Sequence, residues 1–287
     1  MQPVILFRQD NYTKSEFEEI KNLNKFDLVN YRSEIKPDSL VIGRYSVLPF
    51  YKELNVDIEN LGSKMLQNVH EHQYIANMDY IYDLKDFTPK TWFRLQDVPE
   101  KFKNKPFVLK GRTNSRKQQW KTKMFANNFT EAVNIANQLL DDQLINSQGI
   151  VIREFNELIT YEYDLMGLPR TCEYRLFFLK DKLLAFGYYW GNIENQELPK
   201  QDYQDFLANG IPFAKKMAEI VKENATFFVI DIAKTVENKW IVIELNDGQM
   251  SGLNDTISPQ VLYSNLYREM VNLNYTNEFK KTEKNKF

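Results

Sequence analysis

The alternation of apolar and polar residues along the chain predicts an α+β protein that begins with a small α/β unit. Pro3–Phe7 is a short apolar run, as expected of a buried strand, and Thr13–Leu23 carries apolar residues at helical spacing. Phe26–Tyr31 and Ser39–Tyr45 predict two further strands, and Leu61–Asn77 predicts a second helix, with Lys64 in its first turn. This order of elements favours a sheet with a parallel component.

The remainder of the chain predicts more strands than helices. The expected strands are Phe107–Lys110, Gly149–Phe155, Thr171–Leu179, Lys182–Trp190, Phe227–Ala233 and Trp240–Leu245. The expected helices are Asn128–Leu140, Ser258–Leu273 and one or two helices within Tyr203–Asn224. Two pairs of strands follow one another closely, around Lys180-Asp181 and around Glu237-Asn238, and each pair predicts a hairpin.

The last hairpin carries polar residues on otherwise apolar strands. A two- or four-residue loop about Glu237-Asn238 would place Asp231 directly opposite Glu244, on the face that also holds Asn246, whereas a three-residue loop would shift this register. Opposed carboxylates destabilise a sheet unless something neutralises them. A Mg²⁺ ion would do so, because it prefers oxygen ligands and substrate phosphates. A solvent-facing hairpin end with harmless acids is the alternative interpretation.

The most charge-biased window is Lys101 to Lys123, which holds nine Lys or Arg residues and no Asp or Glu. Lys110 ends a predicted strand, and a turn-rich loop with Arg112 and Arg116 follows it. A basic, flexible loop after a strand lysine suits polyphosphate binding, since lysine supplies a point charge and arginine a fork. Two other interpretations stay open: a solvated basic face, or a nucleic-acid footprint in which Trp120 stacks on a base.

Arg175 lies between apolar neighbours in a predicted strand and must therefore find an anion. Its partner is either a carboxylate, such as Glu173, or a phosphate group in transfer. His70 and His72 are the only histidines, and at this spacing on a helix they point apart. We expect both histidines to be on the surface and expect no histidine-based acid–base chemistry.

Composition describes an ordinary globular protein and excludes several classes. The chain has 287 residues, 43% apolar and 26% charged, with a net charge of −2, so nothing pulls it as a whole toward nucleic acid or membrane. The single cysteine, Cys172, excludes an internal disulfide framework and fits a reducing compartment. The chain shows neither a signal peptide nor an apolar run of about 18 residues, so we expect a cytoplasmic protein without membrane partners.

Asp231, followed by Glu244 and then Asn246, resembles the metal-binding end of the ATP-grasp superfamily, and similar features extend from about Leu61 to about Leu253. The resemblance implies an ATP-grasp fold, in which two α+β lobes clasp a nucleotide behind a small α/β subdomain. The implied parts are an N-terminal subdomain (1–85), a central lobe with the basic phosphate loop (86–155), a C-terminal lobe with the metal hairpin (156–273) and a flexible tail (274–287).

The resemblance also implies roles for individual residues. Asp231, Glu244 and Asn246 would bind one or two Mg²⁺ ions, with Mn²⁺ as a substitute, and Arg175 and Lys110 would be catalytic. Glu154 and Phe155 would form the adenine hinge and Glu157 would contact ribose, although Glu154 is equally well explained as a strand-end charge. The residues expected to bind ATP are Lys64, Lys110, Arg112, Arg116, Glu154, Phe155, Glu157 and Arg175.

The implied activity is that of an ATP-dependent, ADP-forming ligase, which joins a carboxylate to an amine through an acyl phosphate. The acceptor would be an amino acid, a peptide or a protein. Two alternatives remain open from the sequence. One is an ATP-dependent nucleic-acid ligase or kinase on the same fold, which would use the 101–123 window. The other is a non-catalytic nucleotide-binding module.

Overall fold

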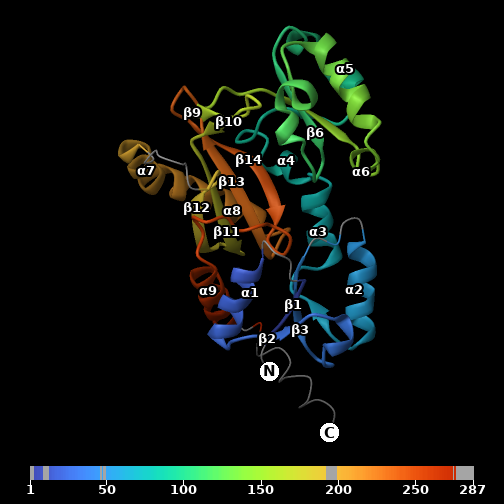
Figure 1. Cartoon of the computed structure of the whole chain (residues 1–287), viewed down its shortest axis with the longest axis vertical. Coiled ribbons are helices and arrows are strands. Elements are labelled where there is room, and N and C mark those ends of the chain that lie inside the picture. Colours follow the sequence, from blue (N-terminus) through green and yellow to red (C-terminus); the bar gives the residue numbers. More distant parts are fainter. Residues whose placement is uncertain are drawn as a thin grey trace.

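Three sheets lie one above another along the long axis of the molecule (Figure 1). The computed structural model describes residues 3–8, 13–45, 47, 50–191, 199–273 and 275. The tail expected at 274–287 lies outside these residues except for residue 275. None of the helices in the described ranges combines the length and the apolar character that a membrane span requires.

The N-terminal sheet is parallel, as its element order predicts, and has the strand order β2-β1-β3-β4. Its elements are β1 (Val4–Phe7), α1 (Lys14–Leu23), β2 (Asp27–Val29), β3 (Leu40–Arg44), α2 (Tyr51–Asn60) and β4 (Lys64–Met65). Alternate residues of β1 face opposite ways: Leu6 packs with Leu54 of α2, and Ile5 packs with Ile20 of α1. The sheet is therefore covered by a helix on each face.

The helix predicted over Leu61–Asn77 is wrong in its first half. Lys64–Met65 forms the edge strand β4, in which the Lys64 N–H donates to the Ser39 carbonyl at 3.0 Å. The helix α3 (Val69–Ala76) begins only after Asn68, whose side chain accepts from the Glu71 N–H at 3.0 Å while the Glu71 carboxylate accepts from the Asn68 N–H at 2.9 Å. This capping box fixes the start of the helix. A short helix α4 (Tyr80–Asp83) follows.

The central lobe is an antiparallel sheet of order β5-β8-β6-β7 with the helix α5 against one face. Its elements are β5 (Thr91–Trp92), β6 (Phe107–Gly111), β7 (Phe125–Ala126), α5 (Phe129–Leu140), α6 (Gln143–Asn146) and β8 (Ile150–Glu154). Between β6 and β7 the basic window forms a 3₁₀ turn (Lys117–Gln119) and a π-helical turn (Trp120–Met124). The lobe forms the upper end of the molecule in Figure 1.

The C-terminal lobe is built on an antiparallel sheet of order β12-β11-β13-β14. Its elements are β9 (Thr160–Tyr163), β10 (Pro169–Thr171), β11 (Glu173–Leu179), β12 (Lys182–Tyr188), α7 (Lys200–Asp205), α8 (Ile211–Val221), β13 (Phe227–Lys234), β14 (Trp240–Asp247) and α9 (Pro259–Asn272). A π-helical turn (Phe206–Gly210) joins α7 to α8, within the region where one or two helices were expected.

The two faces of this sheet differ in a way that positions the site. Phe228 and Ile230 face a wholly apolar core shared with α8. On the other face, Phe227 and Val229 pack against α9 and the N-terminal subdomain, in one continuous core. Further along that face, Asp231 and its neighbours are polar and face the central lobe. The N-terminal subdomain and the C-terminal lobe thus share a core.

The β13–β14 hairpin pairs Asp231 with Glu244, as predicted, but not through the predicted loop. The Thr235 N–H donates to the Lys239 carbonyl at 2.9 Å, so the loop has three residues, and Asn238 adopts the left-handed φ of 59° that such loops require. The resulting shift is cancelled by a β-bulge, because the ladder skips Ile243 between its pairs. The two carboxylates meet only because of this bulge.

Candidate functional site

A cavity of about 460 Å³ lies between the central sheet and the C-terminal sheet. Part of its wall is apolar and comes from both sheets and from the segment between them; the residues that form it include Val108, Met124, Phe125, Phe155, Leu158, Trp190 and Ile243. The rest of the wall is charged, and its cations and carboxylates come from different lobes. A flat apolar group and a polyanionic group can therefore occupy the same cavity.

Lys110 and Glu244 form an ion pair across the cavity and so connect the two lobes. Lys110 is near the end of β6 and Glu244 is in β14, and both line the cavity. Burial by itself raises the pKa of a carboxyl, but the Lys110 ammonium outweighs this effect and holds the pKa of Glu244 below its ordinary value. The Arg153 guanidinium, also on the cavity wall, donates to the Ile243 carbonyl beside Glu244.

Arg175 and Asp231 form a second pair next to the first. The Arg175 Nε and Nη2 donate to the two Asp231 carboxylate oxygens at 2.8 and 2.7 Å, and the Asn246 amide donates to the same carboxylate at 3.1 Å. Asp231 has no exposed surface. Burial opposes the charged form of Arg175, yet the Asp231 carboxylate raises the pKa of the guanidinium above its ordinary value. The structure thus gives Arg175 a carboxylate partner, one of the two open from the sequence, though Asp231 rather than Glu173.

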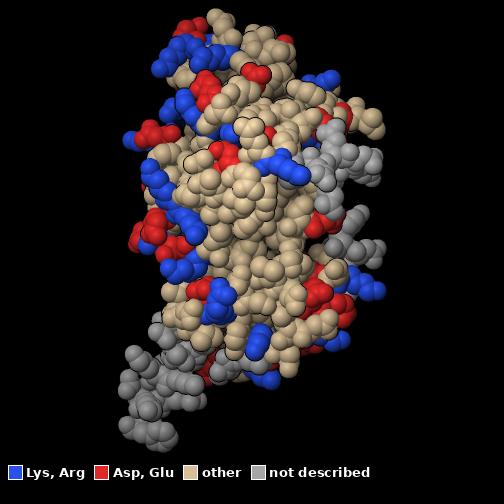
Figure 2. Space-filling model, turned by 90° about the vertical axis from the view of Figure 1, so that its left-hand side faces the viewer, with Lys and Arg blue, Asp and Glu red and all other residues tan. Residues whose placement is uncertain are grey.

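The basic window does not act as one surface. Its Lys117 points to Tyr189, donating to the phenol oxygen with its ammonium 4.1 Å from the ring centroid, and lines the cavity. Arg116 turns away and binds Asp142, with its Nε 2.8 Å from the carboxylate. Figure 2 shows Lys and Arg side chains interspersed with Asp and Glu on one face of the molecule, whose middle is largely uncharged.

Glu173 is a site residue for which the sequence suggested only a role as a partner of Arg175. It is 4% exposed, lines the cavity, and accepts a hydrogen bond from the Thr171 hydroxyl at 3.3 Å. Burial raises the pKa of Glu173 to about 7, even though the nearby Lys117 ammonium acts in the opposite direction. Alternation with Arg175 on β11 was the one sequence signal that placed it on this face.

The structure brings together most of the residues expected to bind ATP and metal. Lys110, Glu154, Phe155, Glu157 and Glu244 line the cavity. Their neighbours Arg175, Asp231 and Asn246 form the buried pair described above.

Three expected ATP ligands are elsewhere. Lys64 is exposed on β4 in the N-terminal sheet, Arg112 lies over the Phe93 ring at 4.9 Å, and Arg116 binds Asp142. None of the three is among the described residues that line the cavity. Lys117 lines it in their place, two lobes away from Lys64 along the long axis in Figure 1.

The donor set at the two pairs suits a hard cation. Asp231 and Glu244 are directly opposed and Asn246 contributes an amide, so oxygen ligands of the kind that Mg²⁺ prefers lie together. No group of three or more His, Cys, Asp or Glu side chains arranged to hold a metal occurs within the described ranges. A metal here would therefore use two carboxylates and the amide, and Arg175 and Lys110 would have to give up their present contacts with those carboxylates.

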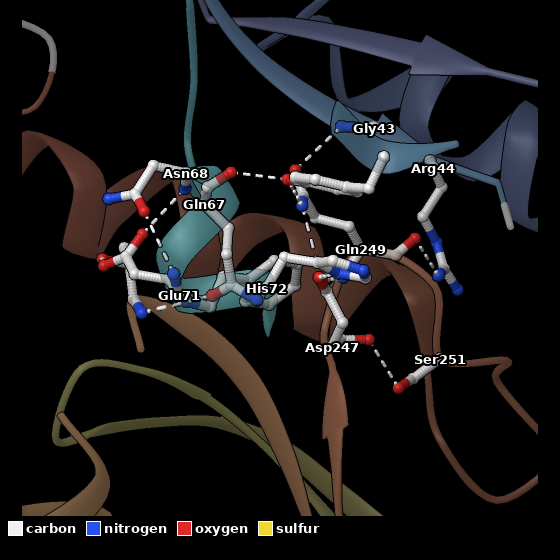
Figure 3. Close-up of polar contacts among 12 residues, drawn as sticks. Gly43, Arg44, Gln67, Asn68, Glu71, His72, Asp247, Gln249 and Ser251 are labelled. Atoms are coloured by element: carbon white, nitrogen blue, oxygen red, sulfur yellow. Dashed lines mark hydrogen bonds and ion pairs between the residues drawn. The ribbon is translucent and has the colours of Figure 1, made fainter. Parts of the chain in front are cut away.

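Beyond Asn246, the chain enters a buried polar junction with the N-terminal subdomain (Figure 3). His72 of α3 is buried and its Nδ1 lies 2.9 Å from the Asp247 carboxylate, so the expectation of two surface histidines is wrong for His72. His70 is exposed, as expected. The partner of His72 is 175 positions along the chain, which no local pattern signals.

A family model for an ATP-grasp domain, the third family of its clade, matches residues 95–266. Among solved structures, D-alanine–D-alanine ligase from Bacillus anthracis aligns with a TM-score of 0.57 at 14% identity, covering 96% of this chain and 98% of that one. The D-cycloserine synthetase DcsG aligns with a TM-score of 0.56 at 12% identity, covering 90% and 95%. The ATP-grasp ligase PsnB, complexed with a minimal precursor, aligns with a TM-score of 0.52 at 11% identity, covering 93% and 97%.

No curated protein matches the chain. At these identities the likeness to solved structures concerns the fold, and it confirms the predicted α+β ATP-grasp architecture. The family match covers more than half of the 287 residues and includes Lys110, Arg175, Asp231, Glu244 and Asn246. The protein therefore belongs to this family of ATP-grasp domains.

Proposed function

We propose that this protein is an ATP-dependent, ADP-forming ligase that joins a carboxylate to an amine through an acyl phosphate. The observation that carries the proposal is the pairing of Lys110 with Glu244 across two sheets, beside the pairing of Arg175 with Asp231. This arrangement gathers the cations that a triphosphate needs and the carboxylates that its metal needs in one cavity. Membership of an ATP-grasp family supports ATP as the nucleotide.

The cavity suggests an orientation for the nucleotide. Val108, Phe155 and Ile243 offer apolar walls on which adenine would stack, next to the backbone of the segment after β8. The phosphates would lie at the charged end, where Lys110 and Lys117 reach the cavity and Arg175 is close by. Each of these cations is present before the ligand binds, so little rearrangement is needed to neutralise the phosphates.

Asp231, Glu244 and Asn246 are the residues that would hold one or two Mg²⁺ ions, with Mn²⁺ as a substitute. When bound, such an ion bridges phosphate oxygens and neutralises the charge that develops during phosphoryl transfer. The buried Asp231 carboxylate supports this role, since it is already arranged to face a cation.

The reaction then needs little covalent help from the protein. An oxygen of the acceptor carboxylate attacks the γ-phosphorus, and the bond to the β-phosphate oxygen breaks, so that ADP leaves with that electron pair. An amine nitrogen next attacks the carbonyl carbon of the acyl phosphate. Inorganic phosphate leaves and the nitrogen loses a proton, which gives the amide. Arg175 would stabilise the transferring phosphoryl group by its fixed fork of donors.

The acceptor would be an amino acid, a peptide or a protein. Solved structures of similar fold favour this range: one is a D-alanine–D-alanine ligase, and another, PsnB, is complexed with precursor peptide PsnA2 and AMPPNP. A buried Cys172 and the absence of disulfides among the described residues are compatible with a cytoplasmic location, which we propose for the activity.

A nucleic-acid ligase or kinase has less support. The comparisons reported above give no support to a nucleic-acid enzyme, and the cations of the basic window point in different directions. A non-catalytic module would not need two buried carboxylates facing cations beside a nucleotide-sized cavity.

Calorimetric titration of ATP, with and without Mg²⁺, tests the proposal. We expect metal-dependent binding in the micromolar range by the wild type and its loss in the double variant Asp231→Asn/Glu244→Gln. A screen for ADP release over amino acids and peptides would then identify the acceptor. Absence of binding by the wild type, with or without metal, would refute the assignment and leave the non-catalytic module as the better interpretation.

A further inference from the structure

The strongest unexplained feature outside the cavity is the buried acid Asp247, the last residue of β14 (Figure 3). It is one peptide bond from Asn246, and its side chain is only 5% exposed. One carboxylate oxygen lies 2.9 Å from His72 Nδ1, and the other accepts from the Gln249 N–H at 2.9 Å. A buried carboxylate is costly unless it is paired and hydrogen-bonded, so this junction is specified by its partners.

His72 is itself held firmly. Its ring stacks on Tyr51 of α2, with centroids 4.0 Å apart and planes inclined by 9°. The Tyr51 hydroxyl in turn donates to the Gln67 carbonyl, just before α3. The position of the imidazole is therefore fixed by the N-terminal subdomain and by α3, and not by the lobe that carries Asp247.

The loop after Asp247 is tied to the N-terminal sheet by a second set of bonds. The Gln249 amide oxygen accepts from the Gly43 N–H at 3.1 Å, and its amide nitrogen donates to the Tyr51 hydroxyl at 2.7 Å. The Gln249 carbonyl accepts from Arg44 Nη1 at 3.1 Å. Figure 3 shows these groups converging from the N-terminal strand, α3 and the end of β14.

Both ends of this loop reach the charged end of the cavity. At its start, Asn246 donates to the Asp231 carboxylate at 3.1 Å. At its end, the Gly252 carbonyl accepts from Arg175 Nη1 at 3.1 Å. The loop thus connects a proposed metal ligand and a proposed phosphate ligand to the junction with His72.

We propose that His72 is a positioning residue for the metal and phosphate end of the nucleotide site. It acts through Asp247 to fix the backbone at Asn246, and Gln249 fixes the same loop from the N-terminal sheet. The N-terminal subdomain is then part of the metal site, although none of its described side chains is a proposed metal ligand. This inference rests on the proposed Mg-ATP site, and it predicts that loss of the junction weakens metal binding more than it weakens the fold.

The test is the Mg²⁺ concentration that gives half-maximal ATP binding in calorimetry, measured together with the melting temperature. His72→Phe keeps an aromatic ring on Tyr51 but removes the donor to Asp247. Partners outside the first shell of a metal are typically worth 10–100-fold in its affinity, so we expect the half-saturating Mg²⁺ concentration to rise at least about tenfold. His72→Asn retains a donor near the Nδ1 position, and we expect it to restore most of the loss. The matched control is His70→Phe, because His70 is exposed on the same helix.

Gln249→Ala provides a second variant should His72→Phe fail to fold, and it loosens the loop from the other side. An unchanged Mg²⁺ requirement in the variants that fold, with a lower melting temperature alone, would make the junction merely structural and overturn the inference. Equal losses in His72→Phe and His72→Asn would also overturn it. If the wild type shows no metal-dependent ATP binding, the proposed function fails as well, and the two failures are thereby distinguished.

Discussion

Arg175 and Asp231 are directly opposed on the neighbouring strands β11 and β13, and the guanidinium binds both carboxylate oxygens. The acid that a metal would need is therefore neutralised by a cation of the protein itself. A buried acid and a metal-like cation in direct contact imply competition: whatever binds Asp231 as a cation must displace Arg175. Since Arg175 would then be free to meet phosphate, the pair couples metal binding to phosphate binding.

The competition predicts the behaviour of Arg175→Met. Removing one partner of a buried ion pair costs about 3–5 kcal/mol, because the other charge is left uncompensated. We expect the variant to be destabilised by this amount without metal, and we expect Mg²⁺ to raise its melting temperature more than that of the wild type. The measurement is thermal unfolding with and without Mg²⁺.

Arg94→Met is the control for that experiment. Arg94 also pairs with a carboxylate, Asp97, but its side chain is 67% exposed. Exposed pairs contribute little, so this variant should unfold like the wild type and show no extra response to metal. An equal Mg²⁺ response in Arg175→Met and the wild type would contradict the competition.

Glu173 makes the stability of the protein depend on pH. Burial raises its pKa to about 7 from an ordinary 4.5, so between these values the folded state binds more protons than the unfolded state. Stability contributed by this group is present below about pH 4.5 and is lost as the pH rises to about 7, a change of about 3 kcal/mol. Glu173→Gln removes the titration, so it should stabilise the protein at pH 8 and have little effect at pH 5.

Urea unfolding of both proteins at the two pH values measures this difference. Glu18→Gln is a suitable control, because Glu18 is an exposed acid on α1 and its replacement should change stability equally little at either pH. A Glu173→Gln variant that is less stable than the wild type at pH 8 would show that the carboxylate is needed in its charged form.

The metal hairpin could be predicted from sequence because the alternation of residues along a strand is a local property. It placed Asp231 with Glu244 and put Lys110 at the end of its strand, and the structure confirms these positions. The register itself was right for a reason that the sequence did not reveal. A three-residue loop displaces the ladder and the bulge at Ile243 restores it, and nothing local at Ile243 signals a bulge.

The contacts that sequence could not provide are those between distant elements. Arg175 meets Asp231 because β11 lies beside β13, and His72 is buried because the loop after β14 closes over α3. Lys64 was misplaced for a related reason. A two-residue edge strand such as β4 is too short for a periodic signal, and only its pairing with β3 reveals it.

The exchange of Lys64 for Lys117 is itself testable. Lys117 lines the cavity and lies among Tyr189, Glu173 and Glu244, whereas Lys64 is exposed in another sheet. We expect Lys117→Ala to weaken Mg-ATP binding about tenfold or more, since a charge-assisted contact is worth roughly 1.5–3 kcal/mol. Lys64→Ala is the matched control and should bind ATP like the wild type. The reverse result would restore the role inferred from sequence.

The last prediction concerns nucleic acid and the 101–123 window. Several of its cations are paired with acids: Arg116 binds Asp142, Lys103 binds Glu100 and Lys105 binds Glu154. A polynucleotide footprint needs cations that are free to replace the counterions of successive phosphates.

We therefore expect no saturable binding of a single-stranded RNA oligonucleotide in fluorescence anisotropy at about 50 mM salt. Mg-ATP binding to the same sample serves as the positive control. Tight binding that weakens steeply with salt and is lost in Lys121→Ala/Lys123→Ala would instead assign the window to a nucleic acid, because both lysines lie in the loop beside the cavity and are engaged in no ion pair among the described residues. It would then make the nucleic-acid enzyme, and not the peptide ligase, the better account of a cavity whose rim carries these cations.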